Sequence, residues 1–182
     1  MKITEEFEYI GKRLFNEGLV GGNFGNMSVR TEGGFYITKS GSYLDECEEV
    51  KFISDDGVPE AGASSEWRVH YAVYKQRPDV LAIVHAHPAY AVAVSFDRDC
   101  IVTKDSEGKM LCPKIPVATG EPGTEELARN VAAALSNSNA AVARGHGTFT
   151  VGKNLKDAYL MTSIAEHASK IVYLTGDHPL HP

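Results

Sequence analysis

Residues 79–88 constrain the fold of this chain more than any other stretch. They read Asp-Val-Leu-Ala-Ile-Val-His-Ala-His-Pro and directly follow Pro78. A short apolar run with β-branched residues, bounded by such breakers, is typical of a buried strand. Side chains alternate between the two faces of a strand, so His85 and His87 point the same way. Pro88 has no backbone N–H to donate and therefore ends the strand.

A third imidazole follows a second apolar run. His146 lies between two glycines, soon after residues 140–143, which are Ala-Ala-Val-Ala. Flanking glycines let a backbone or a ligand approach the ring closely. Three histidines that leave a fourth position open are typical of catalytic zinc, whereas a structural zinc site has four protein ligands, usually with cysteine. We therefore predict that His85, His87 and His146 bind a divalent metal, in preference to purely structural hydrogen bonding.

Composition limits the classes of protein and partner. The 182 residues, 43% of them hydrophobic, suit one soluble domain covering residues 1–182. A net charge of −6 without a Lys/Arg cluster disfavours nucleic acid and anionic membranes as partners. The start of the chain lacks the features of a signal peptide, and no apolar run reaches membrane-spanning length. Three cysteines without C-x-x-C spacing indicate reduced thiols in the cytoplasm, although a pairing of Cys100 with Cys112 stays open.

Capping residues and apolar spacing predict five helices. They span residues 4 to about 18, 63–74, 89–96, 124–137 and 155–174. The predicted N-caps are Thr4, Ser64 or Ser65, and Thr124. The buried face of the first helix is predicted to comprise Phe7, Ile10, Leu14 and Phe15.

Alternation and turn residues predict several strands. Residues 27–30 and 34–38 form a hairpin, and further strands cover 50–53, 115–117 and 140–143. Residues 149–151 extend the last of these as an edge or a hairpin. Residues 105–109 are predicted to form an exposed turn, and His178 and His181 in the tail are predicted to be solvated.

Two loops and one helix start are suited to binding an anion. Residues 18–30 contain four glycines and two asparagines, and residues 38–41 form a second small polar loop. Backbone amides in such loops can form an anion-binding nest. Around Ser64 and Ser65, the free N–H groups and positive dipole of a helix start would also favour an anion. The glycine spacing is neither that of a Rossmann fingerprint nor that of a P-loop.

Glu66 and His70 come next in the chain. A first-turn acid such as Glu66 usually serves to stabilise the helix dipole. His70 shares a helical face with Glu66, so it is either a neighbour of the site or an ordinary helix residue, and the spacing favours the second reading.

Five motifs in this order resemble the class II aldolase/adducin family, in particular its fuculose-1-phosphate aldolase-like members. The motifs are Gly25-Asn26-Met27-Ser28, Thr38-Lys39-Ser40-Gly41, Ser64-Ser65-Glu66, His85-Ala86-His87 and Gly145-His146-Gly147. The similarity covers nearly the whole chain. It implies a three-layer α/β fold, in which helices flank a central, mainly antiparallel sheet. It also implies a cyclic homotetramer with sites at subunit interfaces.

The resemblance assigns roles to the residues. It implies one Zn²⁺ per subunit on His85, His87 and His146, where imidazole ligands would also suit Mn²⁺ or Co²⁺, and it makes Glu66 the acid/base. The residues implied to bind the substrate phosphate are Asn23, Asn26, Ser40, Gly41, Ser64 and Ser65. The implied reaction cleaves a ketose 1-phosphate, such as L-fuculose 1-phosphate, into dihydroxyacetone phosphate and a small aldehyde such as lactaldehyde. It would pass through a metal-stabilised enediolate.

Two features depart from the family pattern. Residues 103–107 include no tyrosine, although family aldolases carry one hereabouts to protonate the aldehyde oxygen, so Asp105 or a residue of the adjoining subunit is expected to assist. The chain also ends soon after its last helix, so we expect no C-terminal extension over the site.

The scaffold also hosts pentulose-phosphate 4-epimerases, a methylthioribulose-phosphate dehydratase, decarboxylases and non-catalytic adducin-like modules, which stay as alternatives. The three histidines and Glu66 favour an enzyme.

Overall fold

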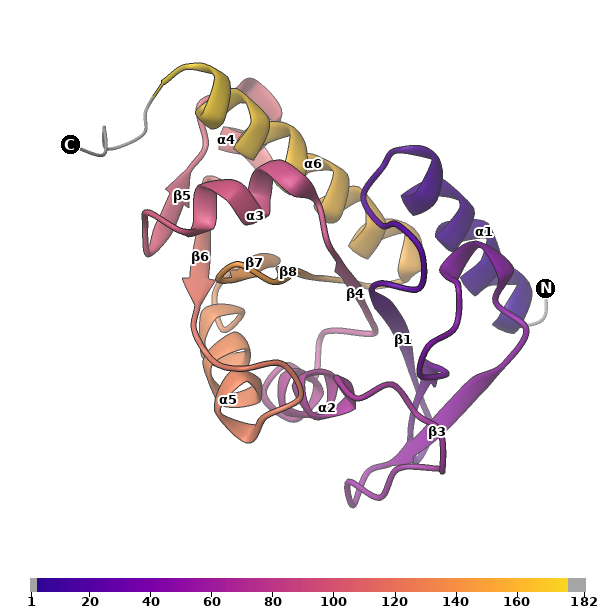
Figure 1. The fold of residues 1–182 in the computed structure, drawn as a ribbon. Coiled ribbons are helices and arrows are strands. Elements are labelled where there is room, and N and C mark those ends of the chain that lie inside the picture. Colours follow the sequence, from indigo (N-terminus) through magenta and orange to yellow (C-terminus); the bar gives the residue numbers. More distant parts are fainter. Residues whose placement is uncertain (1–2, 177–182) are drawn as a thin grey trace.

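A computed structural model describes residues 3–176, in which eight strands form one sheet between two layers of helices (Figure 1). The strands are β1 (Asn26–Thr31), β2 (Gly34–Thr38), β3 (Val50–Ser54), β4 (Ala82–Ala86), β5 (Cys100–Val102), β6 (Lys114–Ala118), β7 (Ala140–Ala143) and β8 (Gly147–Gly152). Their order across the sheet is β3-β2-β1-β4-β8-β7-β6-β5. Among these described strands only β6 and β7 pair in parallel, which confirms the mainly antiparallel sheet.

The helices divide between the two faces of the sheet. On one face lie α1 (Ile3–Asn16), α3 (Ala89–Ser95), α4 (Ser106–Leu111) and α6 (Leu155–Leu174) (Figure 1). On the other face lie α2 (Trp67–Gln76) and α5 (Glu125–Ala134), which pack against each other. A short 3₁₀ helix, η1 (Leu44–Glu46), packs against α1. This is the three-layer α/β fold that the resemblance to the family implies.

Alternation along β4 decides on which face its histidine lies. Ile83 belongs to the core cluster beneath α2 and α5, whereas Val84 belongs to the cluster beneath α1 and α6. His85 therefore shares the α2/α5 face with Ile83. Phe149 of β8 pairs with His85 across the sheet and stacks on its ring at 4.1 Å between centroids. The site thus opens toward the start of α2.

Several predicted elements are confirmed. The β1–β2 hairpin turns through Gly33, whose positive φ suits glycine. Thr124 caps α5, because its Oγ1 accepts a hydrogen bond from the backbone N–H of Leu127 at 3.2 Å. The last helix runs from Leu155 to Leu174, as its apolar spacing and terminal Gly176 predict.

The helix predicted for residues 63–74 instead begins at Trp67. The backbone N–H of Ser64 donates to the Thr38 carbonyl, and Ala63 forms a bridge with Lys39. This extended pairing holds the two serines outside the helix, so the predicted serine cap is wrong. Glu66 occupies the N-cap position, and its side chain makes no capping bond.

Two expectations for the first helix are also wrong. The helix extends back to Ile3, so Thr4 lies within it and is not the N-cap. Phe7, Ile10 and Leu14 are fully buried, and burial of each contributes roughly 1.5–3 kcal/mol. Phe15 is 46% exposed, because it lies beside the helix face formed by these three residues and not on it.

Residues 105–109, predicted as a turn, belong mostly to helix α4. Asp105 caps this helix by accepting a hydrogen bond from the backbone N–H of Gly108 at 2.8 Å. Gly108 fits here because a side chain would collide with Thr103 and with the Asp105 carboxylate. A strand that the sequence did not indicate, β5, precedes α4 and pairs with β6.

Other predictions concern the cysteines and the tail. Cys47, Cys100 and Cys112 are free thiols within residues 3–176, so the pairing of Cys100 with Cys112 does not form. His178 and His181 lie outside the described residues. None of the helices between residues 3 and 176 is both long and apolar enough to cross a bilayer.

Candidate metal and substrate site

Three imidazoles meet where β4 ends beside the β7–β8 turn. His85 lies in β4, and His87 follows the strand. His146 lies in the tight turn between β7 and β8, where its backbone N–H donates to the Ala143 carbonyl at 3.0 Å. Gly147 permits the close approach of β8 to β4, because a Cβ at this position would lie 2.3 Å from a β4 carbonyl oxygen.

The distances between the three rings suit one shared ion. The Nε2 atoms of His85 and His87 lie 3.0 Å apart, and one nitrogen from each of the three rings lies within 4.8 Å of the others. Two nitrogens bound to one tetrahedral zinc at about 2.0–2.1 Å lie about 3.3 Å apart. The donor set therefore fits a divalent metal with small adjustments of the side chains.

Neighbouring groups hold two of the rings in orientation. His85 Nδ1 lies 2.9 Å from the Thr148 carbonyl oxygen, so this nitrogen donates its proton and leaves the Nε2 lone pair for a metal. The Phe24 ring stacks on His87, with centroids 5.4 Å apart and planes within 9°. The Nδ1 atom of His146 is buried and has no hydrogen-bond partner in the described chain.

Burial keeps these imidazoles neutral. It lowers the pKa of His85 well below its ordinary value, with the neighbouring histidines adding to the effect. Burial also lowers the pKa of His87, to about 4, and that of His146. Neutral imidazoles are the form that binds metal.

The two carboxylate oxygens of Glu66 differ, because one accepts a backbone hydrogen bond and the other has no partner in the part of the chain that is described. Its Oε1 accepts a hydrogen bond from the backbone N–H of Gly123, at 2.9 Å, in the loop before α5. Its Oε2 is buried and makes no hydrogen bond to any described residue. Burial raises the pKa of Glu66, and the Gly123 hydrogen bond opposes part of that rise. A carboxyl group tuned upward in this way is suited to proton transfer.

All the predicted site residues line one cavity of about 220 Å³. They are the ligands His85, His87 and His146, the acid Glu66, and the polar residues Asn23, Asn26, Ser40, Gly41, Ser64 and Ser65. The lining also includes residues to which the sequence analysis gave no role of their own: Phe24, Gly25, Lys39 and Pro122. Lys39 lies within a loop already predicted to bind an anion, and its cationic charge was the available signal. Nothing in the sequence marks Phe24 or Pro122, since stacking on a ligand and contributions from distant loops appear only in three dimensions.

Backbone bonds bring the polar loops of the cavity together. The backbone N–H of Ser40 donates to the Gly62 carbonyl at 2.9 Å, next to the bond between Ser64 and Thr38. Asn26 begins β1, directly opposite His85, and its Oδ1 is buried without a partner among residues 3–176. Polar groups from several loops therefore line the cavity together with Phe24. Their role in binding phosphate stays a prediction.

Comparison with known proteins places the chain in a family. The model of the Class II Aldolase and Adducin N-terminal domain matches residues 5–173. The chain belongs to this family. It is an enzyme of the class II aldolase type, a lyase, and class II aldolases depend on a metal.

Its relatives in this family include named aldolases. The chain is 37% identical over 166 residues to the L-fuculose phosphate aldolase of Escherichia coli K12, covering 87% of this chain and 76% of the relative. It is 31% identical to the L-fuculose phosphate aldolase of Methanococcus maripaludis C7, covering 90% and 92%. The crystal structure of L-fuculose-1-phosphate aldolase from Thermus thermophilus superposes with a TM-score of 0.90 at 37% identity, covering 94% and 93%.

Asp105, expected to assist in place of the family tyrosine, does not line this class II aldolase cavity. Its carboxylate caps α4 instead. Among the described residues no tyrosine lines the cavity either. Of the two alternatives raised by the sequence, a group from an adjoining subunit stays open.

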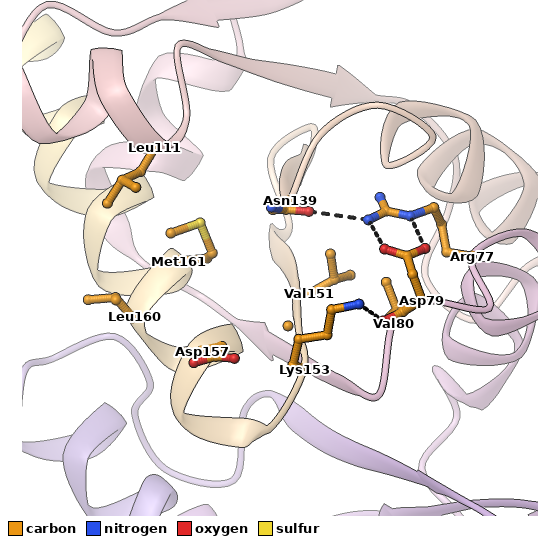
Figure 2. A pocket seen from close by; sticks show the side chains of 11 residues that line it. Arg77, Asp79, Val80, Leu111, Asn139, Val151, Lys153, Asp157, Leu160 and Met161 are labelled. Carbon is orange, nitrogen blue, oxygen red and sulfur yellow. Dashed lines mark hydrogen bonds and ion pairs between the residues drawn. The ribbon is translucent and has the colours of Figure 1, made fainter.

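A second cavity, of about 300 Å³, lies near the start of α6, where β8 ends (Figure 2). Its charged side chains all bind nearby groups of the protein. Arg77 forms two hydrogen bonds of 2.7 Å with the Asp79 carboxylate, and Lys153 donates to the Asp79 carbonyl oxygen. This arrangement stabilises the fold locally and, unlike the histidine cavity, does not bring unpaired catalytic groups together.

Proposed function

We propose that this class II aldolase cleaves a ketose 1-phosphate of the L-fuculose 1-phosphate type. The products are dihydroxyacetone phosphate and a small aldehyde such as lactaldehyde. One observation carries the proposal: three neutral imidazoles and a buried carboxylate with a free oxygen share one cavity with polar loops suited to phosphate.

The metal is proposed to be Zn²⁺, one per subunit, held by His85, His87 and His146. Three neutral nitrogen donors with an open position suit catalytic zinc, and imidazole also accepts Mn²⁺ or Co²⁺. A bound divalent cation supplies Lewis-acid stabilisation of negative charge on substrate oxygens.

Glu66 is proposed to move the proton at the substrate carbon. Cleavage of the C3–C4 bond transfers the proton of the C4 hydroxyl to a base, for which a group of the adjoining subunit is proposed, and leaves the electron pair of the broken bond on the dihydroxyacetone phosphate half. That half must then gain a proton at C3. The Oε2 atom of Glu66 is free to carry this proton, while Oε1 stays on the Gly123 N–H and fixes the carboxyl plane. Burial raises the pKa of Glu66, which favours the protonated form that can donate to C3.

The polar loops are proposed to hold the phosphate. Hydroxyl and amide groups of Asn23, Asn26, Ser40, Ser64 and Ser65, with the backbone at Gly41, line the cavity together. Binding a phosphate away from the reacting carbons fixes the sugar relative to Glu66, so that binding energy serves orientation.

We further propose a cytoplasmic homotetramer with sites at subunit interfaces. Phe24 supports this arrangement, because it is an apolar ring, 55% exposed, at the edge of the cavity. A neighbouring subunit would cover it and would supply the group that takes the C4 hydroxyl proton on cleavage and returns it to the aldehyde oxygen in the reverse reaction. Light scattering of the purified enzyme at a mass other than four chains would contradict the tetramer.

The test is a coupled assay for dihydroxyacetone phosphate released from L-fuculose 1-phosphate. Glu66→Gln should lower kcat by roughly two to four orders of magnitude and keep the metal, because it removes the proton carrier but no proposed ligand. Glu60→Gln, at an exposed acid, is the control and should keep full turnover. Full turnover of Glu66→Gln would reject its role. Consumption of substrate without dihydroxyacetone phosphate would point instead to epimerase or dehydratase chemistry.

A further inference from the structure

Behind the cavity, three buried side chains form a hydrogen-bonded network for which the proposed reaction has no direct use. Ser28 lies on β1, and His70 and Tyr74 lie one turn apart on α2. Ser28 Oγ is 2.6 Å from His70 Nδ1 and 2.8 Å from the Tyr74 hydroxyl. The other ring nitrogen, His70 Nε2, is buried and has no hydrogen-bond partner between residues 3 and 176.

The network determines where the His70 proton resides. Burial raises the pKa of Tyr74 above its ordinary value, so the phenol keeps its proton. The hydrogen bond found for this hydroxyl is the one to Ser28, so Tyr74 donates to Ser28 Oγ and Ser28 donates onward to His70 Nδ1. Burial lowers the pKa of His70 to about 3, so the imidazole is neutral. A neutral imidazole that accepts at Nδ1 carries its hydrogen on Nε2.

The resulting N–H donor belongs to a residue one turn of α2 after the proposed acid/base, which occupies the N-cap position. His70 follows Glu66 by four residues, and its backbone N–H reaches the Glu66 carbonyl at 3.5 Å. Side chains four residues apart on a helix are neighbours, and the later one leans toward the turn of the earlier one. Glu66 Oε2 is a buried acceptor without a partner in the described structure, and His70 Nε2–H is a buried donor without one. Leaving either group unpaired is unfavourable, because a buried polar group without a partner loses its hydration and gains no hydrogen bond in return.

We propose that His70 is a positioning residue for Glu66: Ser28 and Tyr74 hold it in the Nε2–H tautomer, and this N–H donates to the Glu66 carboxylate during turnover. The bond is not formed in this structure, and catalytic hydrogen bonds often close only in the substrate complex. The Gly123 N–H and His70 Nε2–H would then each bind one carboxylate oxygen and together fix the orientation of the carboxylate plane. The inference rests on the proposed role of Glu66 as acid/base.

The competing explanation is purely structural: His70 joins α2 to β1 through Ser28. Two variants separate the explanations, because the amide nitrogen of glutamine reaches approximately the place of Nε2, whereas that of asparagine reaches the place of Nδ1. We expect His70→Asn to lower kcat about tenfold or more, with KM and metal content unchanged. We expect His70→Gln to keep kcat within about threefold of wild type, since it retains the donor facing Glu66. The reverse order, or equal losses in both variants, would overturn the proposal.

A second measurement does not depend on activity. In the metal-loaded enzyme labelled with ¹⁵N-histidine, the ring signals of His70, assigned by their loss in His70→Gln, should show a protonated Nε2 and an unprotonated Nδ1. Tyr74→Phe, which keeps the ring, should shift this tautomer balance and lower kcat. A protonated Nδ1 in the wild-type enzyme, or an unchanged tautomer in Tyr74→Phe, would overturn the proposal even if His70→Asn fails to fold.

A double-mutant cycle separates failure of this inference from failure of the proposed function. In the Glu66→Gln background, His70→Asn should cause no further loss, because the two residues act through one carboxylate. An additional loss of about tenfold would show that His70 acts elsewhere. Full turnover of Glu66→Gln alone would refute the role of Glu66, while the tautomer measurement would still test the network.

Discussion

The buried imidazole of His70 should make the stability of the fold depend on pH in the acidic range. Its pKa is about 3 in the folded chain, against an ordinary value of 6.5. The unfolded chain therefore binds more protons than the folded chain between these values. The stabilisation from neutral His70 is fully present above pH 6.5 and declines as the pH falls toward 3.

The expected magnitude follows from these two pKa values. Between pH 8 and pH 5, protonation of the unfolded chain at this one site lowers the free energy of unfolding by about 2 kcal/mol. His70→Gln removes this contribution. The variant should be less stable than wild type at pH 8, and the difference between them should shrink by about 2 kcal/mol at pH 5.

The assay is urea unfolding followed by circular dichroism, at one protein concentration and with a chelator present to remove metal binding. Val73→Ala is the matched control, because Val73 is a fully buried residue of the same helix that does not titrate. Its stability difference from wild type should be the same at both pH values. A difference for His70→Gln that stays constant within about 0.5 kcal/mol would refute the assignment of His70 as a buried neutral group.

Three further predictions concern the site. His146→Ala should release most of the metal from the purified enzyme, and elemental analysis showing full occupancy would contradict its role as a ligand. Ser64→Ala and Ser65→Ala should raise KM for L-fuculose 1-phosphate more than for unphosphorylated L-fuculose, and equal effects on both would contradict phosphate recognition. Gly147→Ala should lower stability and metal affinity together, because its methyl group would lie 2.3 Å from a β4 carbonyl oxygen. Thermal unfolding and metal titration measure these effects. Wild-type values in both would contradict the prediction and show that β8 can shift to accommodate the methyl group.

The histidine cluster was predictable because it depends on local rules. Strand alternation places His85 and His87 on one side, and glycines mark the turn that carries His146. The spacing of the chain alone does not bring that turn to the end of β4. Residue type and the flanking glycines associated His146 with the other two histidines, the resemblance to a family agreed, and the β4–β8 pairing brings the turn to the end of β4.

Other parts of the structure arise from pairing between distant segments, which sequence periodicity does not report. Ser64 resembles an N-cap by residue type, yet its backbone bond to Thr38 removes it from the helix. Asp105 resembles the start of an exposed turn, yet it caps α4. His70 looked like an ordinary helix residue, because its partner Ser28 lies on a strand far away in the sequence.

The position of β4 at the centre of the site has a consequence for how the enzyme matures. This strand pairs with β1 on one side and β8 on the other, and these partners come from opposite ends of the chain. Such distant contacts form slowly during folding. A nascent or partly folded chain therefore lacks the complete ion-binding pocket until both pairings exist. Tight binding of the ion would then report that the sheet has formed completely.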